Sequence, residues 1–268
     1  MKYLAGLLIF LSGQALAGPK LYVFDCGLLN LESLEIFNLA ENESSVRQMF
    51  VPCYLVEHKN GLLFWDGGLP KTVADADGPV SIDGGSMVYD RWIVDQLVDM
   101  GIGPSDITYA AYSHLHFDHA GAANSFVKSN VIMQKKEWDA AFGDGGEFID
   151  TTLFDGLKKA NVTFIDGDHD VFGDGSVTLI YTPGHTPGHQ VLLLKLDNTG
   201  QILLSGDLYH TQANRKLQRA PNFNHNEEQT LSSMKKVERF LADTGATLWI
   251  EHDKALADTL KKAPQYYD

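Results

Sequence analysis

The chain has 268 residues, of which 44% are hydrophobic, and a formal net charge of −14 at pH 7. This length and composition suffice for a packed core in one large domain or two small ones. The acidic excess argues against nucleic acid and other polyanions as partners, because phosphate binding requires clustered lysine and arginine.

The N-terminus has the features of a secretory signal peptide. Residues 1–17 contain a lysine, an apolar run too short to span a bilayer, and the cleavage-like sequence Ala15-Leu16-Ala17. No later run is long enough for a transmembrane segment. We therefore predict a periplasmic or secreted protein whose residues 18–268, without repeats or a clear linker, form a single domain. Its two cysteines, Cys26 and Cys53, either pair in that oxidising compartment or remain buried thiols on adjacent strands.

The first half of the mature chain is rich in short strands. The β-rich runs 20–27, 51–59 and 61–68 end in turn residues. Between the first two, residues 28–50 are patchily apolar without clean periodicity, which predicts a loop or short helix. It either covers a substrate or is an ordinary connection packed on the core. Residues 86–102 have near-helical apolar spacing, and 107–114 form a buried strand.

Strands and helices alternate again in the second half. The runs 177–185, 189–196 and 201–207 predict three strands joined by tight turns. Asn226 and Gly245 have the residue types that begin and end a helix. Residues 247–253 form a last strand and 254–264 a closing helix. Two batches of strands, each interleaved with helices, favour two packed sheets with helices outside, an α/β sandwich.

One segment carries an unusual density of metal-binding side chains. In the sequence YSHLHFDHAG, residues 112–121, His114, His116, Asp118 and His119 lie within six positions. Residues two apart on an extended strand point the same way, so His114 and His116 can address one ion. A turn just past them can direct the other two side chains to a neighbouring position. A solvated histidine-rich loop is the alternative.

Further candidate ligands follow apolar runs later in the chain. They are His185, Asp207 and His252, each flanked by turn residues. Together the seven side chains form a sensible two-metal set: His114, His116 and His185 hold one ion, Asp118, His119 and His252 the other, and Asp207 bridges them. Nitrogen and oxygen ligands suit two divalent ions, with Zn²⁺ favoured and Fe, Mn or Co left open.

The motifs HLHFDHAG, TPGHTPGH, SGD and EHD resemble those of the metallo-β-lactamase superfamily along nearly the whole mature chain. This resemblance implies an αββα sandwich of two mixed sheets. The likeness within the superfamily is greatest to the quorum-quenching N-acyl homoserine lactonases. It implies opening of the lactone ring by a metal-bridging hydroxide, with Asp118 shuttling a proton.

The same resemblance suggests roles for residues outside the ligand set. Asp66, in the turn after FW, matches a residue that orients a ligand histidine. In the lactonases a tyrosine three residues past the bridging aspartate contacts substrate. Here Tyr209 stands at two and His210 at three, so both are candidates. His189 is expected to be structural, and His58, His169 and His225 to be surface or hydrogen-bonded residues.

Several alternatives use the same ligands. An exported organophosphate triesterase or broad esterase is the main one, and a non-catalytic metal-binding protein is another. A β-lactamase is disfavoured by Asp207, a glyoxalase-type thioesterase by export, a nuclease by the acidic charge, and an oxygen-reducing di-iron enzyme by His116. The expected partner is a small neutral lactone or ester, and a homodimer is left open.

Overall fold

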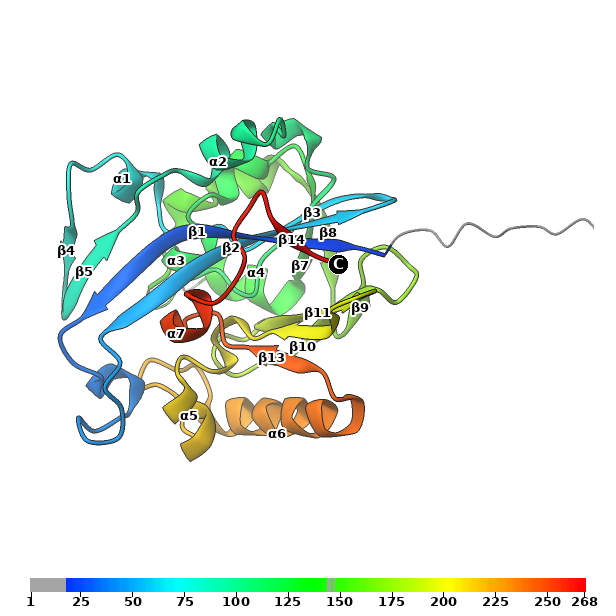
Figure 1. The fold of residues 1–268 in the computed structure, drawn as a ribbon. Coiled ribbons are helices and arrows are strands. Elements are labelled where there is room, and N and C mark those ends of the chain that lie inside the picture. The colour runs from blue at the N-terminus through cyan, green and yellow to red at the C-terminus, as the bar shows by residue number, and fades with distance from the viewer. Residues whose placement is uncertain (1–17, 144–145, 147) are drawn as a thin grey trace, which may run out of the picture.

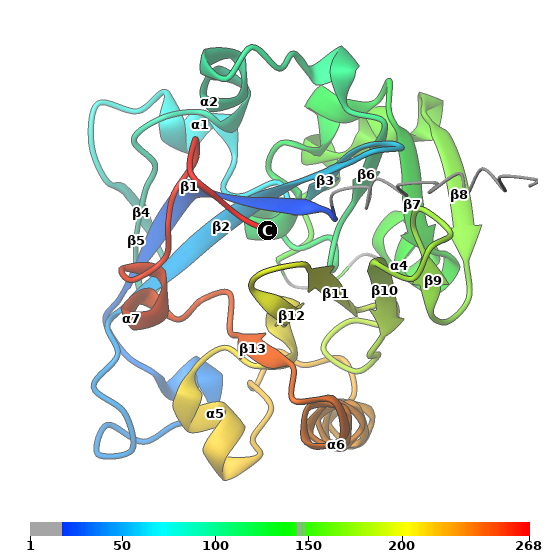
Figure 2. The same cartoon turned by 45° about the vertical axis from the view of Figure 1, so that its right-hand side comes forward.

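The computed structural model describes residues 18–143, 146 and 148–268. The predicted signal peptide, residues 1–17, lies outside the described residues. Within them, two β-sheets face each other and helices lie against their outer faces, as Figures 1 and 2 show. This arrangement confirms the αββα sandwich. No helix among these residues has the length and apolar character needed to cross a membrane.

The sheets divide the chain into an earlier and a later part. In the described residues the first sheet has the order β4-β5-β1-β2-β3-β6-β7-β8, with β14 beside β1. Its strands are β1 Lys20–Leu31, β2 Gln48–His58, β3 Gly61–Trp65, β4 Val80–Ile82, β5 Gly85–Val88, β6 Tyr109–Ala111, β7 Asn130–Gln134, β8 Asn161–Ile165 and β14 Tyr266–Tyr267. The second sheet has the order β13-β12-β11-β10-β9. Its strands are β9 His169–Asp170, β10 Val177–Tyr181, β11 Gln190–Leu196, β12 Gly200–Leu204 and β13 Thr247–Trp249.

Most helices are short connections between strands. The α-helices are α1 Lys71–Ala74, α2 Ile93–Asp99, α3 Phe117–Ala120, α4 Lys135–Phe142, α5 Gln212–Leu217, α6 Glu227–Thr244 and α7 Lys254–Ala257. Single 3₁₀ turns are η1 Glu35–Phe37, η2 Pro104–Asp106, η3 Ala123–Phe126, η4 Thr151–Leu153, η5 Asp155–Lys159 and η6 Gly206–Leu208. The long helix α6 begins and ends as predicted: the Asn226 side chain accepts a hydrogen bond from Gln229 N, and Gly245 follows with a left-handed φ of 70°.

Strand alternation builds three apolar layers. On β11, Leu192 and Leu194 face the first sheet, while Val191 and Leu193 pack with α6. The first sheet alternates in the same way between the inter-sheet layer and the layer under α2. Burying each large apolar side chain contributes about 1.5–3 kcal/mol, so both faces of each sheet require a cover. The four-layer order follows from this pattern.

Several predicted boundaries were wrong; the segment 86–102, for example, begins in strand β5 and is helical only from Ile93 to Asp99. The segment between the first two strands is shorter than 28–50, because β1 runs on to Leu31 and β2 starts at Gln48. A bulge after Asp25 shifts the register and lets Leu28 pair with Phe50. The closing helix, predicted over 254–264, ends at Ala257. Pairing of the last residues with β1 as strand β14 takes the chain away from helical continuation.

Cys26 and Cys53 form a disulfide with an S–S distance of 2.07 Å. It joins β1 to β2 next to the bulge, and both residues are fully buried. Of the two alternatives that the sequence left open, the structure has the paired one.

Candidate metal centre

The structure brings all seven predicted ligands together where the loops after β6, β10, β12 and β13 meet between the sheets. They fall into the two predicted groups. One contains His114, His116, His185 and Asp207, and the other Asp118, His119 and His252. All seven side chains are buried.

The first group points three imidazole nitrogens at one another. His185 Nε2 lies 3.2 Å from both His114 Nε2 and His116 Nδ1. Asp207 Oδ2 lies 3.3 Å from His185 Nε2 and 3.6 Å from His114 Nε2. A neutral imidazole carries only one N–H, so three ring nitrogens that face one another cannot all form hydrogen bonds among themselves.

The second group uses the other oxygen of the same aspartate. Asp207 Oδ1 lies 2.9 Å from His252 Nε2 and 3.2 Å from His119 Nε2. These two nitrogens are 3.3 Å apart. Asp118 Oδ2 stands slightly farther away, 3.6 Å from His252 Nε2 and 3.8 Å from His119 Nε2. Asp207 therefore offers one oxygen to each group, as a bridging carboxylate would.

These donor spacings fit a divalent cation in each group. Ligands about 2.0–2.1 Å from a tetrahedral Zn²⁺ are separated by roughly 3.3–3.4 Å, close to the nitrogen and oxygen spacings here. Asp207 Oδ1 is buried and accepts no well-aligned hydrogen bond among the described residues, although two ring nitrogens lie within 3.2 Å of it. A buried carboxylate oxygen left unpaired is costly, and a cation would satisfy it. The residues thus suit two metal ions.

The local structure differs from the predicted strand. β6 ends at Ala111, so His114 and His116 lie in the connection that follows, and His116 immediately precedes α3. The single turn of α3 carries Asp118 and His119. The side chains nevertheless come together in the grouping that the sequence suggested, because the turn redirects the later pair.

Asp66 orients the ligand histidines, as the resemblance implied. Its carboxylate accepts hydrogen bonds from Ser113 N at 2.6 Å, Ser113 Oγ at 2.8 Å and His119 Nδ1 at 2.8 Å. Since Ser113 Oγ uses its hydrogen on Asp66, it accepts from His114 Nδ1 at 3.0 Å. The Nε2 atoms of both histidines are thereby left free to bind a cation. The sequence analysis did not single out Ser113.

Backbone groups and a neutral histidine fix the other side of the site. His252 Nδ1 donates to the carbonyl of Phe50 at 2.8 Å. His189 Nε2 accepts from Asp207 N at 3.0 Å, which confirms that it has a structural role. Burial lowers the pKa of His189 to about 3, so this ring stays uncharged. Gly206 has a left-handed φ of 47°, and a Cβ atom there would lie 2.7 Å from His189 Nε2.

Sequence reasoning missed two buried glutamates. Glu137 on α4 accepts from Leu115 N at 2.9 Å, Thr186 Oγ1 at 2.6 Å and Gly188 N at 2.9 Å, so it joins the loops that carry His116 and His185. Glu251 accepts from Trp65 Nε1 at 3.2 Å and Gly206 N at 3.0 Å. Burial, followed by the charge of Asp66, raises the pKa of Glu251 to about 8. Glu251 is part of the EHD motif and Glu137 lies far from any quoted motif, and in both cases only partners distant in sequence reveal the role.

The two groups of ligands differ in their affinity for protons. Burial lowers the pKa of His114 and of His116 well below the ordinary value. Burial also opposes a charge on His252, but Asp207 outweighs it and raises the pKa of His252 to about 9. A cation entering the second group must therefore displace a proton from His252, which Asp207 would otherwise help to hold there.

Tyr209 is a correction to the predicted site. Its ring is buried in the layer under α6, and its hydroxyl donates to Glu238 Oε1 at 2.9 Å. It therefore points away from the ligands. His210 turns the other way, with Nε2 3.0 Å from Asp207 Oδ2. Burial lowers the pKa of His210, so it faces the ligands as a neutral ring.

Two cavities open beside the ligands. One, of about 730 Å³, is lined by His210 and His252 together with Asn30, Leu31, Val46 and Thr211. The other, of about 480 Å³, is lined by His116, His185, Ile149 and Phe223. Phe37, in the segment between β1 and β2, packs its ring 5.1 Å from His210 and 5.8 Å from Phe223. That segment thus both packs on the core and borders the site.

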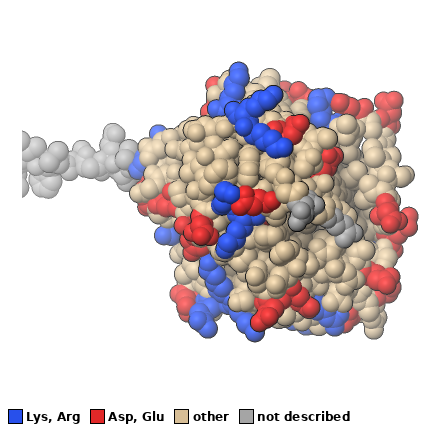
Figure 3. Space-filling view, turned by 180° about the vertical axis from the view of Figure 1, so that it is seen from behind, with Lys and Arg blue, Asp and Glu red and all other residues tan. Residues whose placement is uncertain are grey.

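The remaining predictions concern the surface charge and a histidine outside the site. On the face seen in Figure 3, lysines and arginines are interspersed with aspartates and glutamates. Some lysines pair with nearby acids, such as Lys236 with Asp168 at 3.1 Å. His58 is buried and lies 3.0 Å from Asp174 Oδ2, as expected of a hydrogen-bonded residue.

Comparison with known proteins identifies relatives along almost the whole chain. The sequence profile described as the Metallo-beta-lactamase superfamily matches residues 46–244. The N-acyl homoserine lactonase AttM of Azorhizobium caulinodans is 33% identical over 265 residues, covering 93% of this chain and 98% of that protein. The N-acyl homoserine lactonase AiiA of Bacillus thuringiensis subsp. kurstaki is 30% identical over 253 residues, covering 92% of this chain and 98% of that protein.

A solved structure agrees with these relatives. It is an N-acyl homoserine lactone hydrolase with the product N-hexanoyl-L-homoserine bound at its catalytic metal centre. The fold superimposes with a TM-score of 0.78 at 28% identity, covering 94% of this chain and 100% of that one.

Proposed function

Because the chain belongs to the metallo-β-lactamase superfamily, we propose that it is a lactonase that binds two divalent cations, Zn²⁺ by preference, and opens the ring of N-acyl homoserine lactones. Membership of this superfamily, together with the similarity to named lactonases, makes the chain a metal-dependent hydrolase. The observation that carries the substrate class is similarity of 30–33% to named N-acyl homoserine lactonases over more than nine-tenths of the chain. The two ligand groups sharing Asp207 support the dinuclear centre.

Bound cations would supply the electrophilic chemistry, since they lower the pKa of a shared water from about 15.7 toward 7 and polarise a carbonyl oxygen. The chain's own part is orientation. Asp66, through Ser113 and directly, fixes which nitrogen of His114 and His119 is free. The carbonyl of Phe50 does the same for His252. Rings held in this way lose little freedom when the substrate reacts.

Asp118 is the proposed proton carrier. Its Oδ2 faces the two histidines of the second group. Its Oδ1 takes part in none of the hydrogen bonds and ion pairs among the described residues, so one oxygen stays available for a proton. Ring opening leaves an alkoxide, and a carboxyl group beside it can protonate it. We expect Asp118→Asn to retain its bound cations and to lose rate, because an amide oxygen can ligate but cannot carry that proton.

The surroundings suit a small neutral substrate with an apolar tail. The rings of Phe148 and Phe223, 4.9 Å apart, form an apolar wall beside His116. In this proposal the acyl chain lies against that wall, and the lactone lies over the cations. His210, which borders the larger cavity beside Asp207, replaces Tyr209 as the proposed substrate contact.

A substrate panel tests the activity. The purified chain, loaded with Zn²⁺ and assayed by proton release, should hydrolyse N-hexanoyl and N-decanoyl homoserine lactones far faster than paraoxon or nitrocefin. Turnover of paraoxon alone would instead assign a phosphotriesterase. Metal analysis of the same sample should give two ions per chain. Light scattering would decide whether it forms a homodimer.

Export remains part of the proposal. It rests on the sequence of residues 1–17 and is supported by the Cys26–Cys53 disulfide, since such bonds persist in oxidising compartments. Expression of the full chain in a bacterial host should yield periplasmic protein that begins at Gly18, as read by N-terminal sequencing. Cytoplasmic protein that keeps Met1 would contradict it.

A further inference from the structure

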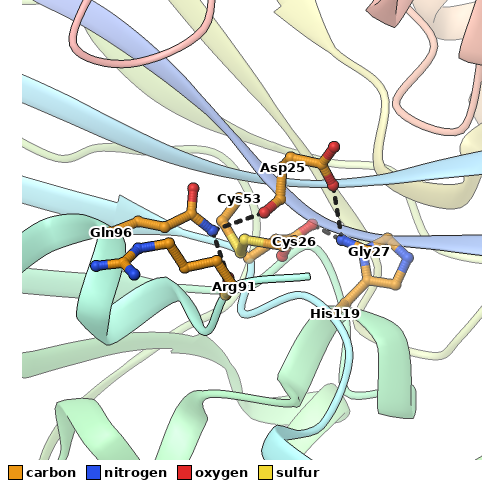
Figure 4. The surroundings of a disulfide bond; sticks show 8 residues. Asp25, Cys26, Gly27, Cys53, Arg91, Gln96 and His119 are labelled. Carbon is orange, nitrogen blue, oxygen red and sulfur yellow. Dashed lines mark hydrogen bonds and ion pairs between the residues drawn. A yellow bond between two sulfur atoms is a disulfide. The ribbon is translucent and has the colours of Figure 1, made fainter. Parts of the chain in front are cut away.

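The disulfide packs against the turn from Asp66 to Leu69, which contacts His119 of the second group of ligands. Figure 4 shows the sulfur pair with its neighbours, which include His119 on one side and Gln96 on the other. Gln96 on α2 donates to the carbonyl of Asp25 at 2.7 Å, and so ties the bulge of β1 to the helix layer. The disulfide therefore lies where the first sheet is tied to the helix layer.

The backbone of Gly68 packs against the disulfide without space for a side chain. A Cβ atom at Gly68 would lie 2.3 Å from Cys26 Cβ and 2.9 Å from Cys53 Sγ. Leu69 N also donates to the carbonyl of Cys26 at 3.1 Å. With a left-handed φ of 64°, Gly68 is a position where only glycine is free of backbone strain.

The same turn grips α3 through its backbone. Gly67 N donates to the carbonyl of His119 at 2.5 Å, Gly121 N donates to the carbonyl of Gly68 at 3.0 Å, and Ala122 N donates to the carbonyl of Gly67 at 3.1 Å. The preceding residue, Asp66, holds the His119 ring at 2.8 Å. Asp66 itself has a φ of 56°, which a non-glycine residue keeps only when its surroundings enforce it.

We propose that the Cys26–Cys53 disulfide is a positioning element for the second cation site, that of Asp118, His119 and His252. It supports the turn from Asp66 to Leu69, which sets both the main chain and the ring of His119. The first cation site depends on this turn less directly, because Asp66 reaches only His114, through Ser113, and Glu137 holds the loops of the other two histidines. The inference rests on the proposed two-cation centre.

The test measures each cation separately. Zn²⁺ is withdrawn from wild type and from the double variant Cys26→Ala/Cys53→Ala by a chromophoric chelator, well below the temperature at which either unfolds. We expect one of the two equivalents to bind about 10–100-fold more weakly in the variant, the usual cost of losing support behind a ligand. The other equivalent should change less than twofold.

A stability control separates positioning from general loosening. Leu194→Ala, in the inter-sheet layer, destabilises the fold without touching the turn and should leave both equivalents unchanged. If the double variant keeps both equivalents at wild-type affinity, or if Leu194→Ala loses the same equivalent, the proposal is overturned. Combining the double variant with Asp66→Asn should cost less than the sum of the two losses, since both act on His119.

A second variant keeps the test open should the alanine pair fail to fold. Gly68→Ala leaves the disulfide intact and displaces the turn, whereas Gly245→Ala imposes the same backbone strain where a Cβ has nothing within 4 Å. Selective loss of one equivalent in the first alone supports the proposal, and equal behaviour of the two overturns it. Wild type that binds fewer than two ions would overturn the dinuclear centre as well. Wild type with two ions and no lactonase activity would refute only the substrate.

Discussion

Two buried aspartates follow strands of the two facing sheets, and they differ in what their carboxylates meet. Asp66 comes after β3 in a turn where it adopts a left-handed φ itself, and Asp207 comes after β12 behind a left-handed Gly206. Asp66 accepts three hydrogen bonds from the chain. Asp207 faces ring nitrogens on both sides, and its Oδ1 accepts no well-aligned hydrogen bond among the described residues. The carboxylate of Asp66 is therefore fully engaged in orienting its neighbours, whereas that of Asp207 is left available for the proposed cations.

Asp207→Asn should have the largest effect, because it alters both cation sites at once. An amide cannot offer an anionic oxygen to each site, and several kcal/mol of transition-state stabilisation depend on the cations. We expect kcat/KM for the lactone to fall by about 10³-fold or more, with fewer than two ions bound by metal analysis. Asp197→Asn, an exposed position at the far end of the sheet, is the matched control. Full activity in Asp207→Asn would remove the distinction between the two aspartates.

Removing the cations should have the next largest effect, a loss in the free energy of unfolding. Where no cation is bound, His185 Nε2 lies 3.2 Å from a ring nitrogen of His114 and of His116, with no cation as their common partner. A ligand that binds only the folded state stabilises it by about 2.7 kcal/mol at 100 times its dissociation constant. Thermal unfolding of chelated and Zn²⁺-loaded protein should show this difference. An unchanged melting temperature would contradict a built metal centre.

Asp66→Asn should cost less than Asp207→Asn, since it removes orientation and no ligand. Loss of such an outer partner weakens metal binding or activity by about 10–100-fold. The loss should concentrate in the cation site that contains His119, because Asp66 contacts that ring directly. Chelator competition would measure the loss of affinity at this site separately from that at the first site. Equal weakening of both sites would show that Ser113 transmits the effect to His114 as strongly.

The contrast between these residues explains what the sequence could predict. The seven candidate ligands could be picked out because four lie in one short motif and the other three each follow an apolar run, and all are of residue types that bind metals. The two sheets followed from strand alternation. The boundaries of β1 and β2 were misjudged because a bulge keeps them paired beyond Gly27, and bulges depend on the partner strand.

The supporting residues were harder to predict for a different reason. Glu137 and Glu251 act through contacts with backbone groups far along the chain, which the residues next to them in the sequence do not show, even though Glu251 directly precedes His252. Tyr209 was misassigned because one residue of offset in the turn after Asp207 decides which side chain faces the site. The φ and ψ values that make that choice, at Gly206 and Asp207, are enforced by packing against Ser113 and His189.

Tyr209→Phe should have the smallest effect on activity. It tests whether Tyr209, which follows Asp207 but points into the layer under α6, supports only the fold. The variant loses the hydrogen bond to Glu238, which costs about 0.5–1.5 kcal/mol in the free energy of unfolding. Lactone turnover should stay within twofold, because the hydroxyl points away from the ligands.

Arg215 and, to a lesser extent, Tyr209 lower the pKa of Glu238. This carboxylate therefore stabilises the fold above its unfolded pKa of about 4.3, and its contribution disappears as the pH falls through the lowered folded value. Denaturant unfolding at pH 7 should accordingly separate wild type from Tyr209→Phe more than at pH 3, and a large loss of turnover would return Tyr209 to the site.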